Sequence, residues 1–133
     1  MEAESWIRIG GVYHLGCAIL HFFFPKLLRW EEDLASVSPL NRAVIWILSK
    51  LLMYAYAALG LGSIWFASEL AKGRAGRFVL VSVSGFWLLR AAFQIKFFDD
   101  FTEYLGSRLY NLLMLLLWLL GAVLYAAPLL WTS

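Results

Sequence analysis

Two histidines are the first residues of this sequence whose type and spacing could carry out chemistry. His14 and His21 lie seven residues apart in an apolar segment. Seven residues make about two turns of an α-helix, so both imidazoles project from one face. Imidazole changes its protonation state near neutral pH, which suits proton transfer inside a membrane. We therefore expect acid–base chemistry or ligand contact from this pair, with hydrogen-bonded structural histidines as the alternative.

A metal or haem site is a further alternative for the same pair. Along a helix the two side chains stand roughly 10.5 Å apart, which is too far for both to bind one small ion without other ligands. Helical metal-binding pairs prefer spacings of three or four residues. We predict no cofactor and no metal; if haem or a metal were bound, His14 or His21 would supply the ligand.

Four more polar side chains interrupt the remaining apolar segments: Lys50, Arg90, Gln94 and Asn111. Ionisable groups within membrane-spanning segments are costly to insert and often mark functional sites. Arg90 offers a planar fork of donors that suits a phosphate, a carboxylate or a carbonyl oxygen, and Gln94 lies one helical turn away. The structural alternatives are an ion pair of Arg90 with a loop carboxylate, an interhelical hydrogen bond from Gln94, and a Lys50 stem that extends to the membrane surface.

Placed by depth, polar residues from all four apolar segments fall at one level of the membrane. They lie in the half next to the loops after the first and third segments: His21, Lys50, Arg90, Gln94 and Asn111. We interpret this level as the polar floor of an aromatic-walled pocket that binds an amphiphile dissolved in the membrane. The residues predicted to contact the ligand are His14, Lys50, Tyr54, Trp87, Gln94 and Asn111.

Chemistry on the head group of such an amphiphile would use three residues. His21 is the predicted proton shuttle, Arg90 the stabiliser of a developing anion, and Asp99 an acid that turns inward from its loop to orient them. Isomerisation, hydration or hydrolysis of an isoprenoid, sterol-like or quinone-like substrate fits these groups. The alternative for Asp99 is a solvated position with weak surface ion pairs.

The elements that must hold these residues are membrane-spanning helices. Of the 133 residues, 62% are hydrophobic and only 15% are charged, whereas a soluble domain is about 45–50% apolar and about 25% charged. A span needs roughly 20 mostly apolar residues, and four stretches meet that need: about 6–30, 43–70, 78–98 and 109–131. We predict an all-α polytopic membrane protein, a four-helix transmembrane bundle in a single domain over 1–133.

Charge and cysteine content exclude several classes of function. The formal net charge is +2, which is too small for a nucleic-acid-binding surface. The sequence has one cysteine, Cys17, which excludes an internal disulfide and a cysteine-rich zinc site. The N-terminal MEAES lacks the basic region of a secretory signal, so we expect the first span to be retained.

We expect an integral membrane protein whose partners are membrane lipids and an amphiphilic small molecule. The compact basic loop at 71–77 favours termini on the cytoplasmic side. Small residues at Ala58 and Gly62 permit close helix contact, either within the bundle or in a homo-oligomer. Two other functions stay open: an accessory membrane subunit whose polar residues hold helices together, and a protomer that conducts protons or ions past His14 and His21.

Overall fold

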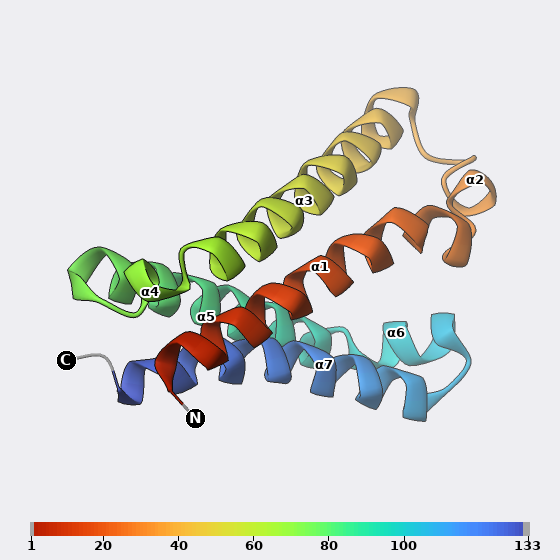
Figure 1. Cartoon of the computed structure of the whole chain (residues 1–133). Helices are drawn as coiled ribbons and strands as arrows, with labels where there is room; N and C mark the ends of the chain where they lie inside the picture. Colours follow the sequence, from red (N-terminus) through yellow and green to blue (C-terminus); the bar gives the residue numbers. More distant parts are fainter. Residues whose placement is uncertain (1, 132–133) are drawn as a thin grey trace. The chain divides into compact units, whose positions relative to one another are not determined.

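The computed structural model describes residues 2–131, and within them the regular secondary structure is helical, without a strand. Four long helices make up most of the chain: α1 (Ala3–Leu27), α3 (Pro39–Trp65), α5 (Gly73–Lys96) and α7 (Arg108–Ala126), as Figure 1 shows. Each of these four, with α7 continued through the 3₁₀ turn η1 (Ala127–Leu130), is long and apolar enough to cross a membrane. The predicted all-α, four-span fold class is confirmed, and the four spans are consistent with an integral membrane location.

Three short helices connect the long ones. α2 (Trp30–Asp33) follows α1, α4 (Ala67–Leu70) follows α3, and α6 (Phe98–Leu105) follows α5. The predicted second span, about 43–70, is therefore two helices, separated at Phe66, where φ is −107° and ψ is 27°. Hydropathy does not reveal this break, because apolar residues, Trp65, Phe66 and Ala67, continue across it.

The first helix begins and ends about three residues earlier than the predicted span of 6–30. Its end is set by Arg29, whose backbone lies in the left-handed region with φ 49° and ψ 43°. The amide of Leu28 still donates to the carbonyl oxygen of Phe24 at 2.8 Å, and the chain then turns into α2. Hydropathy extends the span to Trp30 because it does not register a change of backbone conformation.

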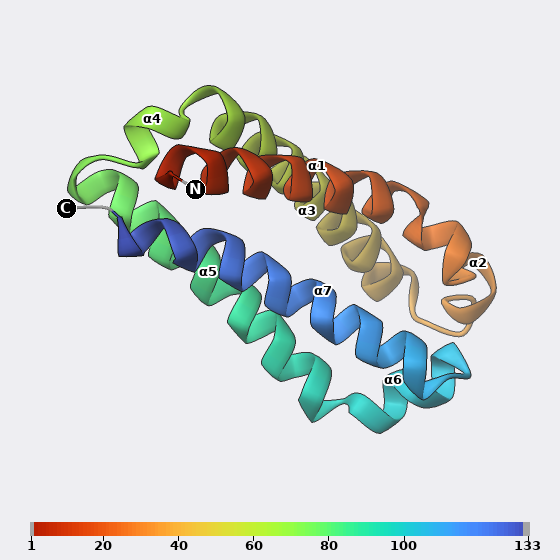
Figure 2. The same cartoon turned by 60° about the horizontal axis from the view of Figure 1, so that its bottom comes forward.

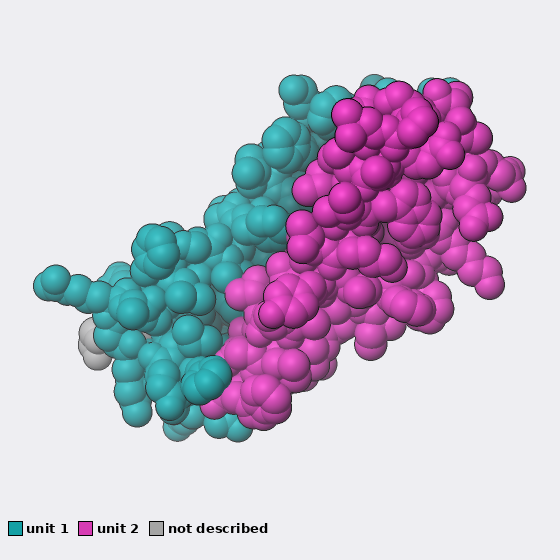
Figure 3. Space-filling model, turned by 90° about the horizontal axis from the view of Figure 1, so that it is seen from above, with its two compact units in different colours: residues 1–10, 66–133 teal, residues 11–65 magenta. Residues whose placement is uncertain are grey.

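Contacts within the chain gather in two compact units (Figure 3). Unit 1 consists of residues 1–10 and 66–133, and unit 2 consists of residues 11–65. The first turns of α1 therefore belong to unit 1 and the remainder of that helix to unit 2. Each unit contains one pair of long helices joined by a short one, and the single domain expected from the sequence stays a prediction.

Unit 2 pairs the part of α1 from Gly11 onward with α3, and two glycines mark the crossing. A Cβ atom on Gly11 would lie 2.7 Å from the Gly60 carbonyl oxygen, and a Cβ atom on Gly60 would lie 2.9 Å from the Gly11 carbonyl oxygen. Both distances are too short for a real Cβ atom, so the backbones approach each other where neither residue has a side chain. Figures 1 and 2 show the two ribbons running alongside one another.

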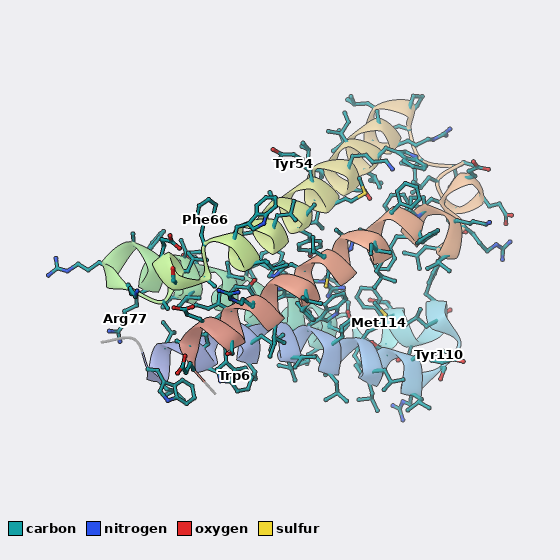
Figure 4. The ribbon with its side chains drawn as sticks, in the orientation of Figure 1. Trp6, Tyr54, Phe66, Arg77, Tyr110 and Met114 are labelled. Carbon is teal, nitrogen blue, oxygen red and sulfur yellow. The ribbon has the colours of Figure 1, made fainter. Side chains whose placement is uncertain are left out.

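The buried face of α3 differs from the face expected from the sequence. Its buried residues are small or carry a hydroxyl group: Ser49, Tyr56, Gly60 and Ser63. Tyr54 is 71% exposed and projects from the side of α3 away from α1 (Figure 4), and Lys50 is exposed as well. Lys50 and Tyr54, both predicted to contact a ligand, therefore do not belong to the buried face of α3. Small residues permit close helix approach and so select the face that packs.

Unit 1 pairs α5 with α7, which run side by side (Figure 2). Trp87 and Trp118 stack between these helices with ring centroids 5.4 Å apart and an interplanar angle of 9°. One turn along α5, the Ser84 hydroxyl donates to the Ala122 carbonyl oxygen at 3.0 Å. Aromatic stacking and one interhelical hydrogen bond thus hold the centre of this unit.

Large apolar side chains cover the outside of every long helix. Representatives from the four helices are between 57% and 73% exposed: Ile19, Ile47, Phe78 and Leu116. A soluble monomer does not expose apolar surface continuously along all its helices, whereas a bilayer solvates such surface. An exposed apolar surface of this kind is consistent with helices that span a membrane.

Candidate functional site

Polar side chains of unit 1 form one connected network between α5, α6 and α7. The Arg90 guanidinium donates to Gln94 Oε1 at 2.9 Å, and the Trp118 indole donates to the same oxygen at 3.3 Å. The Gln94 amide nitrogen in turn donates to Asn111 Oδ1. Two residues predicted from the sequence to lie at one level, Gln94 and Asn111, are therefore in direct contact.

Asn111 connects the network to α6. Its Nδ2 donates to the Phe98 carbonyl oxygen at 2.6 Å and to Thr102 Oγ1 at 2.8 Å, and the Thr102 hydroxyl donates to the same carbonyl at 2.8 Å. Gln94 and Asn111 are both 0% exposed. Each of these buried amides uses both its oxygen and its nitrogen within the protein, which is how buried polar groups avoid a desolvation penalty.

Arg90 lies at one end of this network against two aromatic rings. The guanidinium carbon is 4.7 Å from the Trp118 ring centroid and 5.6 Å from that of Phe101. Stacking of a guanidinium on tryptophan is favourable when the pair is partly desolvated, and Arg90 is part-buried. Trp87 was predicted to line a ligand pocket. Instead it stacks on the Trp118 ring and is 0% exposed.

Asp99 does not turn inward as expected. It is exposed on α6, and the ion pairs Arg8–Glu4 and Arg29–Glu32 do not include it. The expected ion pair with Arg90 is not formed. α6 is short and amphipathic, and a residue facing out from it is solvated more cheaply than it is buried.

Both histidines of unit 2 are buried around a tyrosine that the sequence analysis missed. His14 is 0%, His21 8% and Tyr56 2% exposed. The Tyr56 ring centroid is 5.7 Å from that of His14 and 4.9 Å from that of His21, the latter nearly edge-to-face at 77°. The two imidazoles, which the helical spacing places on one face, are thus both buried. The seven-residue spacing of Ser49, Tyr56 and Ser63 is the signal that could have identified the tyrosine.

The hydrogen bond of His21 to the backbone indicates the tautomer of its ring. Its Nδ1 lies 3.1 Å from the carbonyl oxygen of Cys17, one helical turn earlier. A carbonyl oxygen only accepts, so Nδ1 carries the hydrogen, and Nε2 is the basic nitrogen of the neutral ring. Within residues 2–131 no three His, Cys, Asp or Glu side chains gather to hold a metal ion.

Unit 2 also contains a pocket of about 540 Å³ where α1, α2 and α3 meet. Its lining combines three cations, two acids, two aromatic rings and a proline: Lys26, Arg29, Lys50, Glu31, Glu32, Phe22, Trp46 and Pro25. Of the predicted ligand-contacting residues, Lys50 lines this pocket. The other seven lining residues were not predicted, although a cluster of charged and aromatic residues near one span end is a readable pattern.

Charged groups in this pocket lie against aromatic faces. The Lys50 ammonium is 5.6 Å from the Phe22 ring centroid and 5.9 Å from that of Trp46. Trp46 packs edge-to-face on Trp30, with centroids 5.6 Å apart. Arg29 forms an ion pair with Glu32 across one turn of α2. The pocket thus presents positive charge over apolar rings, next to the exposed face of α3.

The three predicted catalytic residues do not all belong to one unit. His21 lies in unit 2, whereas Arg90 and Asp99 lie in unit 1, so their joint action stays a prediction. Comparison with protein-family models, with curated proteins and with solved structures gives no match to this chain.

Proposed function

We propose that this protein binds a membrane-dissolved amphiphile by its polar head, in the pocket of unit 2. The observation that carries the proposal is the pocket's composition, with Lys26, Arg29 and Lys50 beside Phe22 and Trp46. Cations attract a phosphate or carboxylate, and the aromatic rings accept the first carbons of a tail. The three cations outnumber the two acids of the lining, so an anionic group on the head is favoured.

The apolar surface beside the pocket suits the tail of the same ligand. Ile47, Leu48 and Leu51 follow or flank the lining residues Trp46 and Lys50 on α3, and they are 57%, 59% and 59% exposed. A lipid tail can lie along such a surface without leaving the membrane. The charged side chains then bind the head, and the apolar surface contacts the tail. A lysine at a membrane surface is divided in the same way, into an apolar stem and a charged end group.

Conversion of the ligand by acid–base chemistry is part of the proposal, with His21 as the shuttle. His21 immediately precedes Phe22 and lies one helical turn before Pro25, both of which line the pocket. Its Nδ1–H bond to Cys17 supports Nε2 as the proton acceptor. Arg90 and Asp99 belong to unit 1 and do not line this pocket.

The experiment is native mass spectrometry of the protein released gently from detergent. We expect a bound amphiphile on the wild-type chain, and at least about tenfold weaker retention in the double variant Lys26→Gln/Lys50→Gln, because each charge-assisted contact is worth about 1.5–3 kcal/mol. Lys96→Gln is the matched control, since that lysine also lies over an aromatic ring, Phe97 at 5.3 Å, but does not line the pocket. A wild-type chain without any adduct, or equal retention in all variants, contradicts the proposal.

A second candidate function is favoured by the network of unit 1. Gln94 donates a hydrogen bond to Asn111, and Asn111 donates one to the backbone of α6. The amide groups of both residues therefore already connect helices of unit 1. An accessory membrane subunit needs polar residues only for such hydrogen bonds between its helices. Alanine at Asn111 then lowers stability without changing ligand retention, whereas loss of retention at unchanged stability assigns the network to the ligand.

We also propose that the termini face the cytoplasm. Lys72 lies in the connection between α4 and α5, and Arg74 and Arg77 follow in the first turns of α5. Basic residues next to spans are enriched on the cytoplasmic side. Four spans put that connection on the same side as the termini. The labelling experiment described in the Discussion tests this assignment.

A further inference from the structure

The charged groups of the unit 2 pocket are not equivalent. Arg29 and Glu32 form an ion pair with one another and so neutralise each other. Among the residues that the structure describes, Lys26, Lys50 and Glu31 form no ion pair. The pocket therefore offers a ligand two positive groups and one negative group.

A head with a single negative charge leaves this lining incompletely matched. Its phosphate is attracted by Lys26 and Lys50 but repelled by Glu31, whose carboxylate lines the same space of about 540 Å³. A head that carries both a phosphate and an ammonium matches all three groups, because the ammonium can donate to Glu31 while the phosphate accepts from the lysines. Like-charge juxtaposition is a common source of discrimination between ligands.

We propose that the amphiphile is a phospholipid with a dipolar head, whose phosphate binds Lys26 and Lys50 and whose ammonium binds Glu31. This inference rests on the proposed function, because it specifies the head group bound in that same pocket. The occupant is a lipid and not a free phosphoamine, because the pocket borders an exposed apolar surface at Ile47 and Leu51.

The test is a titration of the purified full chain with phosphatidylethanolamine and phosphatidylglycerol of identical acyl chains, followed by native mass spectrometry. We expect the wild type to bind phosphatidylethanolamine about fivefold more tightly, the effect of one exposed charge pair of about 1 kcal/mol. Glu31→Gln should abolish this preference. Glu103→Gln is the matched control, since it removes an exposed carboxylate outside the pocket, and should keep the preference.

The outcomes separate this inference from the proposed function. If the wild type binds both lipids equally, or prefers phosphatidylglycerol, or if Glu31→Gln leaves the preference intact, the dipolar head is overturned while lipid binding stands. If neither lipid is retained, or if Lys26→Gln/Lys50→Gln retains both as well as the wild type does, the pocket itself is refuted. Circular dichroism of each variant confirms that a lost preference is not a lost fold.

Discussion

Arg29 combines a strained backbone with a side chain in the candidate pocket. Among residues 2–131 it is the one non-glycine residue with positive φ, a conformation that costs an ordinary side chain about 1–2 kcal/mol. Glycine takes this position at many helix ends without strain. The arginine therefore places a guanidinium at the pocket at the expense of stability, a combination found where a position serves binding.

Arg29→Gly and Arg29→Ala form a matched pair for this position. Both remove the guanidinium and its ion pair with Glu32, but only glycine relieves the left-handed backbone. We expect the glycine variant to be about 1 kcal/mol more stable than the alanine variant, measured by unfolding in mixed detergent micelles. Both should retain less amphiphile than the wild type, because the loss of Arg29 leaves the Glu32 carboxylate unneutralised in the pocket, where it repels the phosphate. Equal stability of the two variants would contradict the strain argument, and unchanged retention would remove Arg29 from the pocket.

Asn111 is the residue of unit 1 whose replacement should be most costly. Asn111→Ala removes partners from the buried Gln94 amide, the Phe98 carbonyl and Thr102. Leaving buried polar groups unsatisfied costs about 1–3 kcal/mol, so we expect the unfolding free energy to fall by that amount. Asn41→Ala is the control, because that asparagine is exposed and its replacement should stay within about 0.5 kcal/mol. A similar small effect at Asn111 would show that the network does not hold the helices.

At the scale of elements, packing of α1 on α3 depends on glycines at their crossing. Gly60 and Gly62 lie on the same helix, but a Cβ atom on Gly60 would lie 2.9 Å from the Gly11 carbonyl oxygen, whereas one on Gly62 would meet nothing within 4 Å. The same substitution therefore has opposite expected effects two residues apart.

Gly60→Ala should destabilise unit 2 by about 1–3 kcal/mol through overpacking against backbone. Gly62→Ala should be neutral or stabilising by about 0.5–1 kcal/mol, because alanine restricts the unfolded chain and favours helix. Thermal unfolding in detergent, read by circular dichroism, compares the two. Equal effects at the two positions would mean that the helices do not cross at Gly60.

At the scale of the whole molecule, four spans fix which connections share a side of the membrane. In a Cys17→Ala background, single cysteines at Ser36 and Glu103 report the connections after α1 and α5, and one at Lys72 reports the connection after α4. We expect a membrane-impermeant maleimide to label the first two from one side and the third from the other. If the termini are cytoplasmic, Lys72→Cys is labelled only after the membrane is permeabilised. Labelling of all three from one side would rule out four spans.

The four long apolar helices and their approximate positions follow from the sequence, as does the local pairing of side chains. Membrane partition depends on the apolar length of a segment, which hydropathy measures directly. The inner face of α1 could be predicted because its small and imidazole side chains contrast with Ile19, Phe22 and Phe23, which are 61%, 58% and 49% exposed. Arg90 and Gln94 meet because they lie one helical turn apart.

The tertiary structure alone decided which distant residues meet. Gln94 contacts Asn111 across two helices, Tyr56 rather than Tyr54 packs on the histidines, and charged residues from α1, α2 and α3 gather in one pocket. The physical reason is that hydropathy averages over all faces of a helix, so it does not show which residues of two helices come into contact. Small residues such as Gly11 and Gly60, together with the requirement that buried polar groups be paired, select the face of each helix that packs.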